Sequence, residues 1–100
     1  MPTFVLMTRL APEGSHDAAG RAAMGKEWLK QVKKACPQVK FLAHYAILGP
    51  YDFMDIYDAP DAETAHKVSV ISRARGAVTA ESWQALAYDE FLKLLKDVQG

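Results

Sequence analysis

The stretch from Val39 to Leu48 carries one charge in ten residues and has apolar side chains on both sides of the strand that it predicts. It reads VKFLAHYAIL and ends at a Gly-Pro turn signal. Successive side chains of a strand point to opposite faces. One face is expected to hold Phe41, Ala43, Tyr45 and Ile47, and the other Leu42, His44, Ala46 and Leu48. An antiparallel sheet with one face in water alternates apolar and polar residues, so this chain must cover both faces of its sheet.

Periodicity and turn residues divide the rest of the chain. Apolar residues three or four apart, with lysines between them, predict a helix that begins near Ser15 and ends before Pro37. Asp61 is placed to cap a second helix, and Gly76 to close it. The expected elements are strand 3–10, helix 15–36, strand 39–48, strand 53–59, helix 61–76, strand 77–86 and helix 89–98. This β-α-β-β-α-β order with a C-terminal helix predicts an α+β, ferredoxin-like fold with a four-stranded antiparallel sheet, and we expect residues 1–100 to form a single domain.

The strand at residues 3–10 is also apolar on both faces, with Phe4 and Leu6 opposite Val5 and Met7. Two long helices cover only one face, which leaves roughly eight to ten apolar side chains on the other, each worth about 1.5–3 kcal/mol when fully buried. The terminal helix is too short to cover them all. Because large apolar patches are uncommon on monomers, we expect a homodimer in which two sheets pack face to face, a dimeric α/β barrel.

The overall charge argues against two classes of partner. The chain has 12 Lys and Arg against 12 Asp and Glu, which gives a net charge of zero. It therefore lacks the basic field that holds proteins on nucleic acids or on anionic membranes, and we expect neither partner. The single cysteine, Cys36, cannot form an internal disulfide. With no leader sequence and no apolar run long enough to span a membrane, we expect a cytoplasmic protein.

Metal and cofactor motifs are missing from the sequence. His16, Asp17, Cys36, His44 and His66 are residue types that bind metals, but none shows the spacing of a known metal motif. The glycines fit neither a phosphate-binding loop nor a dinucleotide fingerprint. We expect no metal, no cofactor and no bound nucleotide, and we interpret Cys36 as a small buried apolar residue.

The polar residues best suited to chemistry lie on the hairpin that residues 39–59 predict. In the register that we favour, His44 faces Tyr57, and Asp55 is its diagonal neighbour on the same face. A carboxylate beside an imidazole fixes its tautomer and favours its charged form, and a phenol nearby can donate or accept a proton. His44, Asp55 and Tyr57 are therefore the candidate catalytic and ligand-binding residues.

Two alternatives stand beside this interpretation. A turn one residue longer would bring Met54, Ile56 and Asp58 next to His44 instead. A lone histidine in an apolar strand is also more often a core or interface residue bonded to a neighbour than a catalyst, because an unpaired polar group is costly to bury.

Two further residues, Arg9 and Trp83, are candidates for a ligand-binding wall. Arg9 and Glu81 are expected on neighbouring strands, where they either pair or line the mouth of a cavity. Trp83 and Trp28 pack by default, although an indole at a barrel mouth can also form the wall of a ligand site.

Three segments carry a resemblance to a known family. They are MPTFVLMTRLAPEG at the start, QVKFLAHYAILGPYDFMDIYDAPDAETA in the middle and TAESWQALAYDEF near the end. Together they resemble the GYD-domain family, whose signature at the hairpin turn is matched by Gly49, Pro50, Tyr51 and Asp52. The resemblance implies a dimeric, ferredoxin-like α/β barrel in a family with no established activity. It supplies no catalytic residues.

The hairpin and the helix after it also resemble the ligand-binding domain of feast-or-famine regulators, without their DNA-reading helices. Two functions follow. The first, which we favour, is a non-enzymatic homo-oligomeric module that binds a small metabolite in or near the cavity between paired sheets, or serves as an assembly platform. The second is a small dimeric-barrel enzyme, similar to the monooxygenase and isomerase groups, that uses His44 with Asp55 and Tyr57 to move a proton.

Overall fold

A computed structural model describes residues 1–12 and 17–100. The elements are β1 (Thr3–Leu10), α1 (Ala18–Ala35), β2 (Lys40–Ala46), β3 (Phe53–Asp58), α2 (Ala62–Ala74), β4 (Ala77–Ala85) and α3 (Tyr88–Gln99). The predicted α+β, β-α-β-β-α-β order with a C-terminal helix is confirmed. The start of the first helix that the sequence predicts, at Ser15, lies outside the described residues.

Both long helices begin at an aspartate. The side chain of Asp17 accepts a hydrogen bond from the Gly20 backbone N–H, and that of Asp61 accepts one from Thr64. These bonds satisfy donors that the first turn of a helix leaves free. After α2, Gly76 has a φ of 112°, a conformation that glycine adopts at little cost. The predicted cap and closing glycine are thus confirmed.

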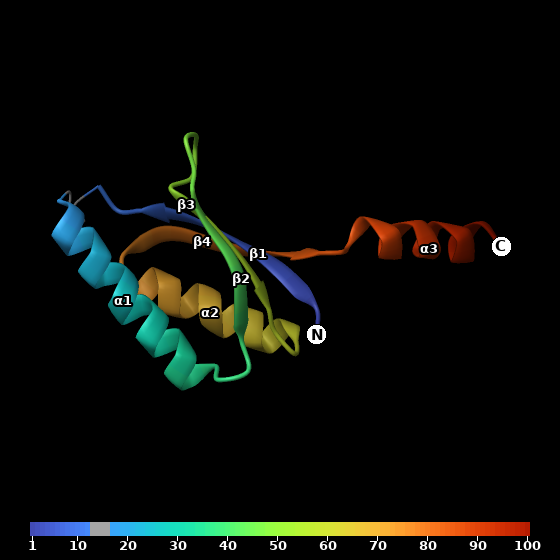
Figure 1. Cartoon of the computed structure of the whole chain (residues 1–100), viewed down its shortest axis with the longest axis horizontal. Coiled ribbons are helices and arrows are strands. Elements are labelled where there is room, and N and C mark those ends of the chain that lie inside the picture. Colours follow the sequence, from blue (N-terminus) through green and yellow to red (C-terminus); the bar gives the residue numbers. More distant parts are fainter. Residues whose placement is uncertain (13–16) are drawn as a thin grey trace.

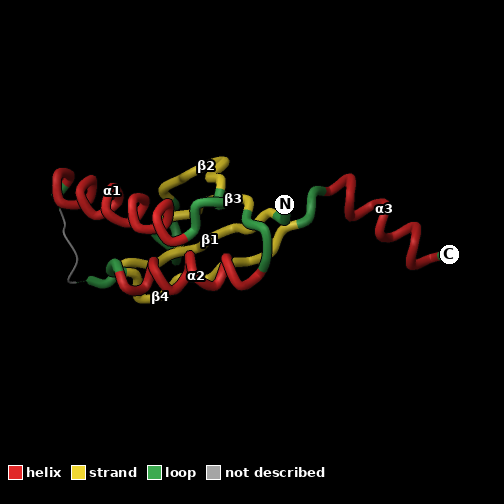
Figure 2. Tube along the Cα trace, turned by 90° about the horizontal axis from the view of Figure 1, so that it is seen from below, coloured by secondary structure: helices red, strands yellow, loops and turns green. Residues whose placement is uncertain are grey.

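The four strands form one antiparallel sheet in the order β2-β3-β1-β4. Figure 1 shows α1 and α2 on one side of this sheet, whereas α3 projects away from it. Figure 2 views the molecule from below, from the side of α1 and α2. The core lies between the sheet and these two helices. Phe4, Leu6 and Tyr57 from the sheet meet Val32 of α1 and Val68 of α2 there, all at most 4% exposed.

The alternation expected for the second strand is wrong at one point. The pairing of β2 with β3 shifts register between Phe41 and Ala43, so Leu42 is the extra residue of a β-bulge. Because of the bulge, Phe41 lies on the same side of the sheet as His44, although the two are three residues apart, and it packs against Trp28 of α1. Ala43 and Tyr45 lie on the opposite side, as predicted.

The side of the sheet away from α1 and α2 is the open face. The register places on it the apolar residues Val5, Met7, Ala43, Tyr45, Met54, Ile56, Trp83 and Ala85. Tyr45 and Trp83 are 54% and 47% exposed. The terminal helix does not cover this face, because α3 extends beyond the end of the sheet and none of its residues is buried. The sequence-based expectation that α3 is insufficient as a cover is confirmed.

Candidate functional site

His44 and Asp55 are direct cross-strand partners rather than diagonal neighbours. The hairpin register differs by two residues from the one that the sequence favours, so the face is unchanged but the pairing is closer. The Nδ1 atom of His44 and the Oδ1 atom of Asp55 are hydrogen-bonded to each other. The His44 side chain is 60% exposed and that of Asp55 only 5%. The carboxylate is therefore inside the protein and the imidazole at its surface.

Tyr57 does not join this pair. The bulge in β2 brings Tyr57 opposite Phe41, and its ring packs between Phe4 and Phe41. Its hydroxyl is hydrogen-bonded to the Ser82 hydroxyl at 2.8 Å. Burial raises the pKa of this phenol. The expected set of three proton-transfer groups is thus wrong for Tyr57, which is a core residue.

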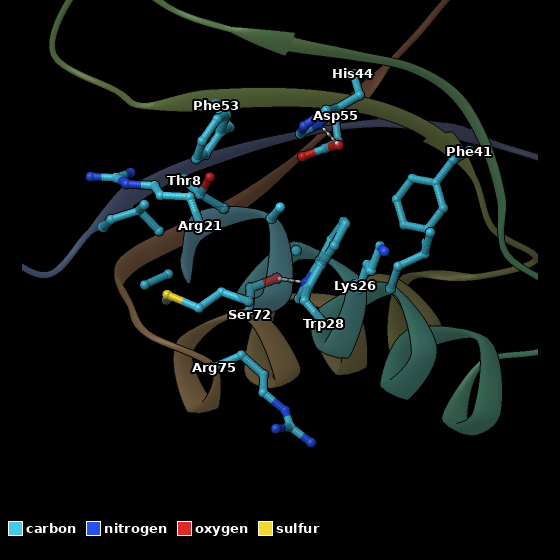
Figure 3. Close-up of a pocket in the computed structure, with 16 residues that line it drawn as sticks. Thr8, Arg21, Lys26, Trp28, Phe41, His44, Phe53, Asp55, Ser72 and Arg75 are labelled. Carbon is cyan, nitrogen blue, oxygen red and sulfur yellow. Dashed lines mark hydrogen bonds and ion pairs between the residues drawn. The ribbon is translucent and has the colours of Figure 1, made fainter. Parts of the chain in front are cut away.

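The pair lines a cavity between α1 and the sheet, which we call the chamber. The chamber has a volume of about 590 Å³, within the range of small-molecule sites. Figure 3 shows its aromatic walls, with Trp28 on α1, Phe41 on β2 and Phe53 on β3. The sequence-based expectation placed His44 and Asp55 between two paired sheets. That location is wrong, because both residues lie on the helix-covered side of the sheet.

Hydrogen bonds fix the chamber walls. The indole Nε1 of Trp28 donates to the Ser72 hydroxyl of α2 at 2.9 Å, and this hydroxyl donates to the Val68 carbonyl. The His44 ring stacks on Phe53, with 5.5 Å between ring centroids. Burial raises the pKa of Asp55, and the neighbouring His44 opposes part of this rise. A buried carboxyl of raised pKa beside an imidazole can exchange a proton with a bound molecule.

Arg9 and Trp83 are on the open face, away from the chamber. Arg9 faces Thr79 across β1 and β4, and Glu81 faces Met7, so Arg9 and Glu81 are on neighbouring strands as predicted but not directly opposite. Tyr51 from the hairpin turn connects them. Its hydroxyl donates to Glu81 at 3.1 Å, and the Arg9 guanidinium carbon lies 5.9 Å from its ring centroid.

Trp83 completes this cluster at the edge of the open face. Its indole Nε1 donates to Glu81 at 3.0 Å, and its ring meets that of Tyr51 edge to face at 6.1 Å. The hydrogen bond to Glu81 raises the pKa of Tyr51. These contacts give a structural role to Tyr51, the tyrosine of the turn signature.

Asp52, the last residue of that signature, is the residue that sequence reasoning missed. Its Oδ2 accepts a hydrogen bond from the Leu10 backbone N–H at 2.6 Å. Its own N–H donates to the Thr8 carbonyl at 2.8 Å, and its carbonyl accepts from Ile47 at 2.9 Å. The turn thereby joins the end of the hairpin to the end of β1. The signal available in the sequence was that Asp52 matches the turn signature of the family that the chain resembles.

Across residues 1–12 and 17–100, no three His, Cys, Asp or Glu side chains come close enough to hold a metal ion. His16 lies outside these ranges. Cys36 is buried against the core, and burial raises the pKa of its thiol. No helix within the described part of the chain has the length and apolar character needed to cross a membrane.

Comparison with known proteins connects the chain to one family and one fold. The GYD domain description matches residues 4–95. A Thermus thermophilus protein named "Glutamine synthetase and cystathionine beta-lyase binding protein" is 29% identical over 96 residues, which cover 96% of this chain and 100% of that protein.

Two solved structures are similar in fold. The crystal structure of an FFRP protein gives a TM-score of 0.53 at 16% identity, covering 86% of this chain and 100% of the other. A hypothetical protein from Pyrococcus horikoshii, PHS023, also gives 0.53, at 18% identity, covering 87% of this chain and 92% of the other. At such low identity the likeness concerns the fold alone.

Proposed function

The chain belongs to the GYD domain family, as its sequence predicts, and we propose that it is a non-enzymatic binding module that works as a homodimer in the cytoplasm. The observation that carries this proposal is the open face. Apolar side chains from all four strands lie side by side on it, and none of the described helices covers it. A second copy is the simplest cover, because a twofold axis brings the same apolar patch of both copies together.

Tyr45 and Trp83 are about half exposed, so covering each contributes about 1 kcal/mol or more. Met54 lies on the inner strand β3, between Met7 and Tyr45, and so belongs to the centre of the patch. Polar residues lie toward its ends, such as Arg9 and Asp58, as in an interface with an apolar centre and a polar rim. The paired sheets would form the dimeric α/β barrel.

The second part of the proposal concerns other proteins. The Thermus thermophilus relative is named for binding glutamine synthetase and cystathionine beta-lyase, and it is similar over its whole length. We infer that this chain likewise binds partner enzymes. The test is a binding titration of the purified chain against both enzymes from its own source organism. Failure to bind either would remove this part and leave the homodimer in place.

The homodimer is tested by molar mass. Analytical ultracentrifugation of the wild-type chain at micromolar concentration should give twice the mass of one chain. The variant Met54→Lys places a charge at the centre of both halves of the interface and should weaken the dimer by about a hundredfold or more. The control Val70→Lys introduces the same charge at an apolar residue of α2, on the other side of the protein, that is 50% exposed, and this variant should stay dimeric. A folded wild-type monomer, or a dimeric Met54→Lys, would overturn the proposal.

One observation favours a second function, a small dimeric-barrel enzyme similar to the isomerase and monooxygenase groups. The hydrogen-bonded pair of His44 and Asp55 lines a cavity large enough for a substrate. A buried carboxylate orients the imidazole for proton transfer to a bound molecule. This enzyme would use two groups, because Tyr57 is bonded to Ser82 instead. Solvent deuterium exchange into a molecule retained by the purified protein, lost in His44→Phe, would establish it.

A further inference from the structure

The chamber is open because the first half of α1 presents small side chains to the sheet. Ala22 and Gly25 lie on its α1 wall, beside the larger Trp28 and Leu29. A Cβ atom added at Gly25 would find no atom within 4 Å. Glycine inside a helix is about 1 kcal/mol less favourable than alanine. At this position the glycine does not allow another protein segment to pack more closely against the helix, and the space in front of Gly25 stays free.

Two nearly buried polar groups face this space without protein partners. Asp55 is 3% exposed, and only its Oδ1 is engaged, by His44. Its Oδ2 has no hydrogen-bond partner among the described residues. Thr8 is 7% exposed and lines the same cavity, and within the described part of the chain its hydroxyl is likewise unbonded. Figure 3 shows both side chains directed into the chamber. Neither free oxygen is a sealed, unsatisfied atom, since among the described residues that condition holds for Thr79 Oγ1; both oxygens are instead accessible from the chamber, where a bound molecule can form hydrogen bonds with them.

The charges around the chamber define what that molecule is. Its buried end holds the Asp55 carboxylate, which only accepts hydrogen bonds, and the Thr8 hydroxyl, which can accept or donate, so the ligand must supply a donor to Asp55. An anionic group would be repelled by Asp55. A cationic group would be disfavoured by Arg21, Lys26 and Arg75, which line the outer parts of the chamber. The group that fits is a neutral hydroxyl.

The aromatic walls define the rest of the ligand. Trp28 and Phe41 approach each other with 5.3 Å between ring centroids, and Phe53 lies on the next strand. Flat apolar rings pack well against such walls. We propose that the chamber binds a small, uncharged, aromatic alcohol of two or three rings, with its hydroxyl donating to Asp55 Oδ2. This inference rests on the chamber alone and is independent of the proposed dimer.

The test uses three naphthalene probes that differ in one substituent. Calorimetric titration of the wild-type chain at pH 7 should show saturable binding of 2-naphthol. The methyl ether 2-methoxynaphthalene keeps the rings but has no donor, and 2-naphthoate carries a negative charge. Both should bind about tenfold more weakly or worse, because each loses the hydrogen bond to a charged acceptor. Absence of 2-naphthol binding, or equal or tighter binding of either analogue, would overturn the proposed ligand class.

Two variants locate the site. Gly25→Leu fills the chamber while improving the helix, so it should fold at least as stably as the wild type and lose 2-naphthol binding. Asp55→Asn should bind about tenfold more weakly, whereas the matched control Asp58→Asn, on the same strand but facing the open side, should bind as the wild type does. Unchanged binding to Gly25→Leu would place the probe elsewhere and refute the site. The monomeric Met54→Lys should bind normally, which separates this test from that of the dimer.

Discussion

Replacing Asp52 tests the role that the structure gives to the turn signature. The Asp52 side chain accepts a hydrogen bond from the Leu10 N–H, 42 residues away in sequence, at 2.6 Å. Its backbone makes two further bonds, to Thr8 and from Ile47. The variant Asp52→Ala removes the carboxylate and keeps both backbone bonds. Its effect therefore reports the side-chain bond between the hairpin and β1.

The expected loss follows from the kind of bond. A hydrogen bond to a charged group contributes about 1.5–3 kcal/mol, and its loss leaves the half-buried Leu10 N–H without this partner. We expect Asp52→Ala to lower the free energy of unfolding by about 2 kcal/mol. For a domain of this size that corresponds to a fall in Tm of roughly 8–15 °C. Asp52→Asn keeps a neutral acceptor of the same shape and should lose only about half as much.

Urea unfolding followed by circular dichroism measures these differences at one fixed protein concentration, so that self-association does not alter the comparison. The control is Asp97→Ala, which removes a carboxylate from the projecting helix α3, where no residue is buried, and should change stability by less than about 0.5 kcal/mol. If Asp52→Ala unfolds at the wild-type midpoint, the turn does not depend on this bond. If Asp52→Asn lowers the free energy of unfolding as much as Asp52→Ala does, the loss of the hydrogen-bond acceptor is not the cause of the destabilisation.

The parts of the fold that depend on neighbouring residues in sequence could be predicted. Asp61 caps α2 and Gly76 closes it because capping and positive φ involve residues within one helical turn. The β1 strand was predicted at its observed bounds, 3–10, because its apolar run is followed by Pro12 and Gly14, which are typical loop residues. The two-sided apolar pattern of that strand also predicted the open face.

The hairpin register depended on a feature that has no local signal. A bulge at Leu42 changes which face Phe41 occupies, and the aromatic packing of Phe41 with Trp28 and Tyr57 rewards that change only in the folded protein. A prediction that assumes strict alternation of side chains along the strand cannot detect this bulge. The sequence therefore predicted that His44 and Asp55 share a face, and missed both their direct pairing and the separation of Tyr57.

The chamber was missed for a related reason. A stripe of small residues on a helix is compatible with close packing as well as with a gap, and the distance between α1 and the sheet is set by larger residues further along. Val32 and Cys36 fix the end of α1 in the core, whereas Ala22 and Gly25 near its start leave the helix away from the sheet. Gly20 and Gly25 in the predicted helix were the available signal, but what they indicate depends on where the helix lies relative to the sheet in the folded protein.

Two predictions remain, one for Asp55 and one for α3. Burial raises the pKa of Asp55 in the folded protein, against the opposing effect of His44, so folding favours its protonated form; the resulting stability is present below the unfolded pKa of about 3.9 and is lost as pH rises through the folded pKa. Urea unfolding measured between about pH 3 and about pH 8 should show that the wild type loses stability relative to the non-titrating Asp55→Asn as the pH rises. A gain in relative stability with rising pH would contradict a raised pKa for Asp55. For α3, no residue is buried, and Phe91, Leu94 and Val98 are 41%, 46% and 77% exposed. Removing residues 87–100 from the monomeric Met54→Lys variant should therefore change its unfolding free energy by less than about 0.5 kcal/mol, whereas a loss above about 1 kcal/mol would mean that this apolar stripe packs on the protein's own body.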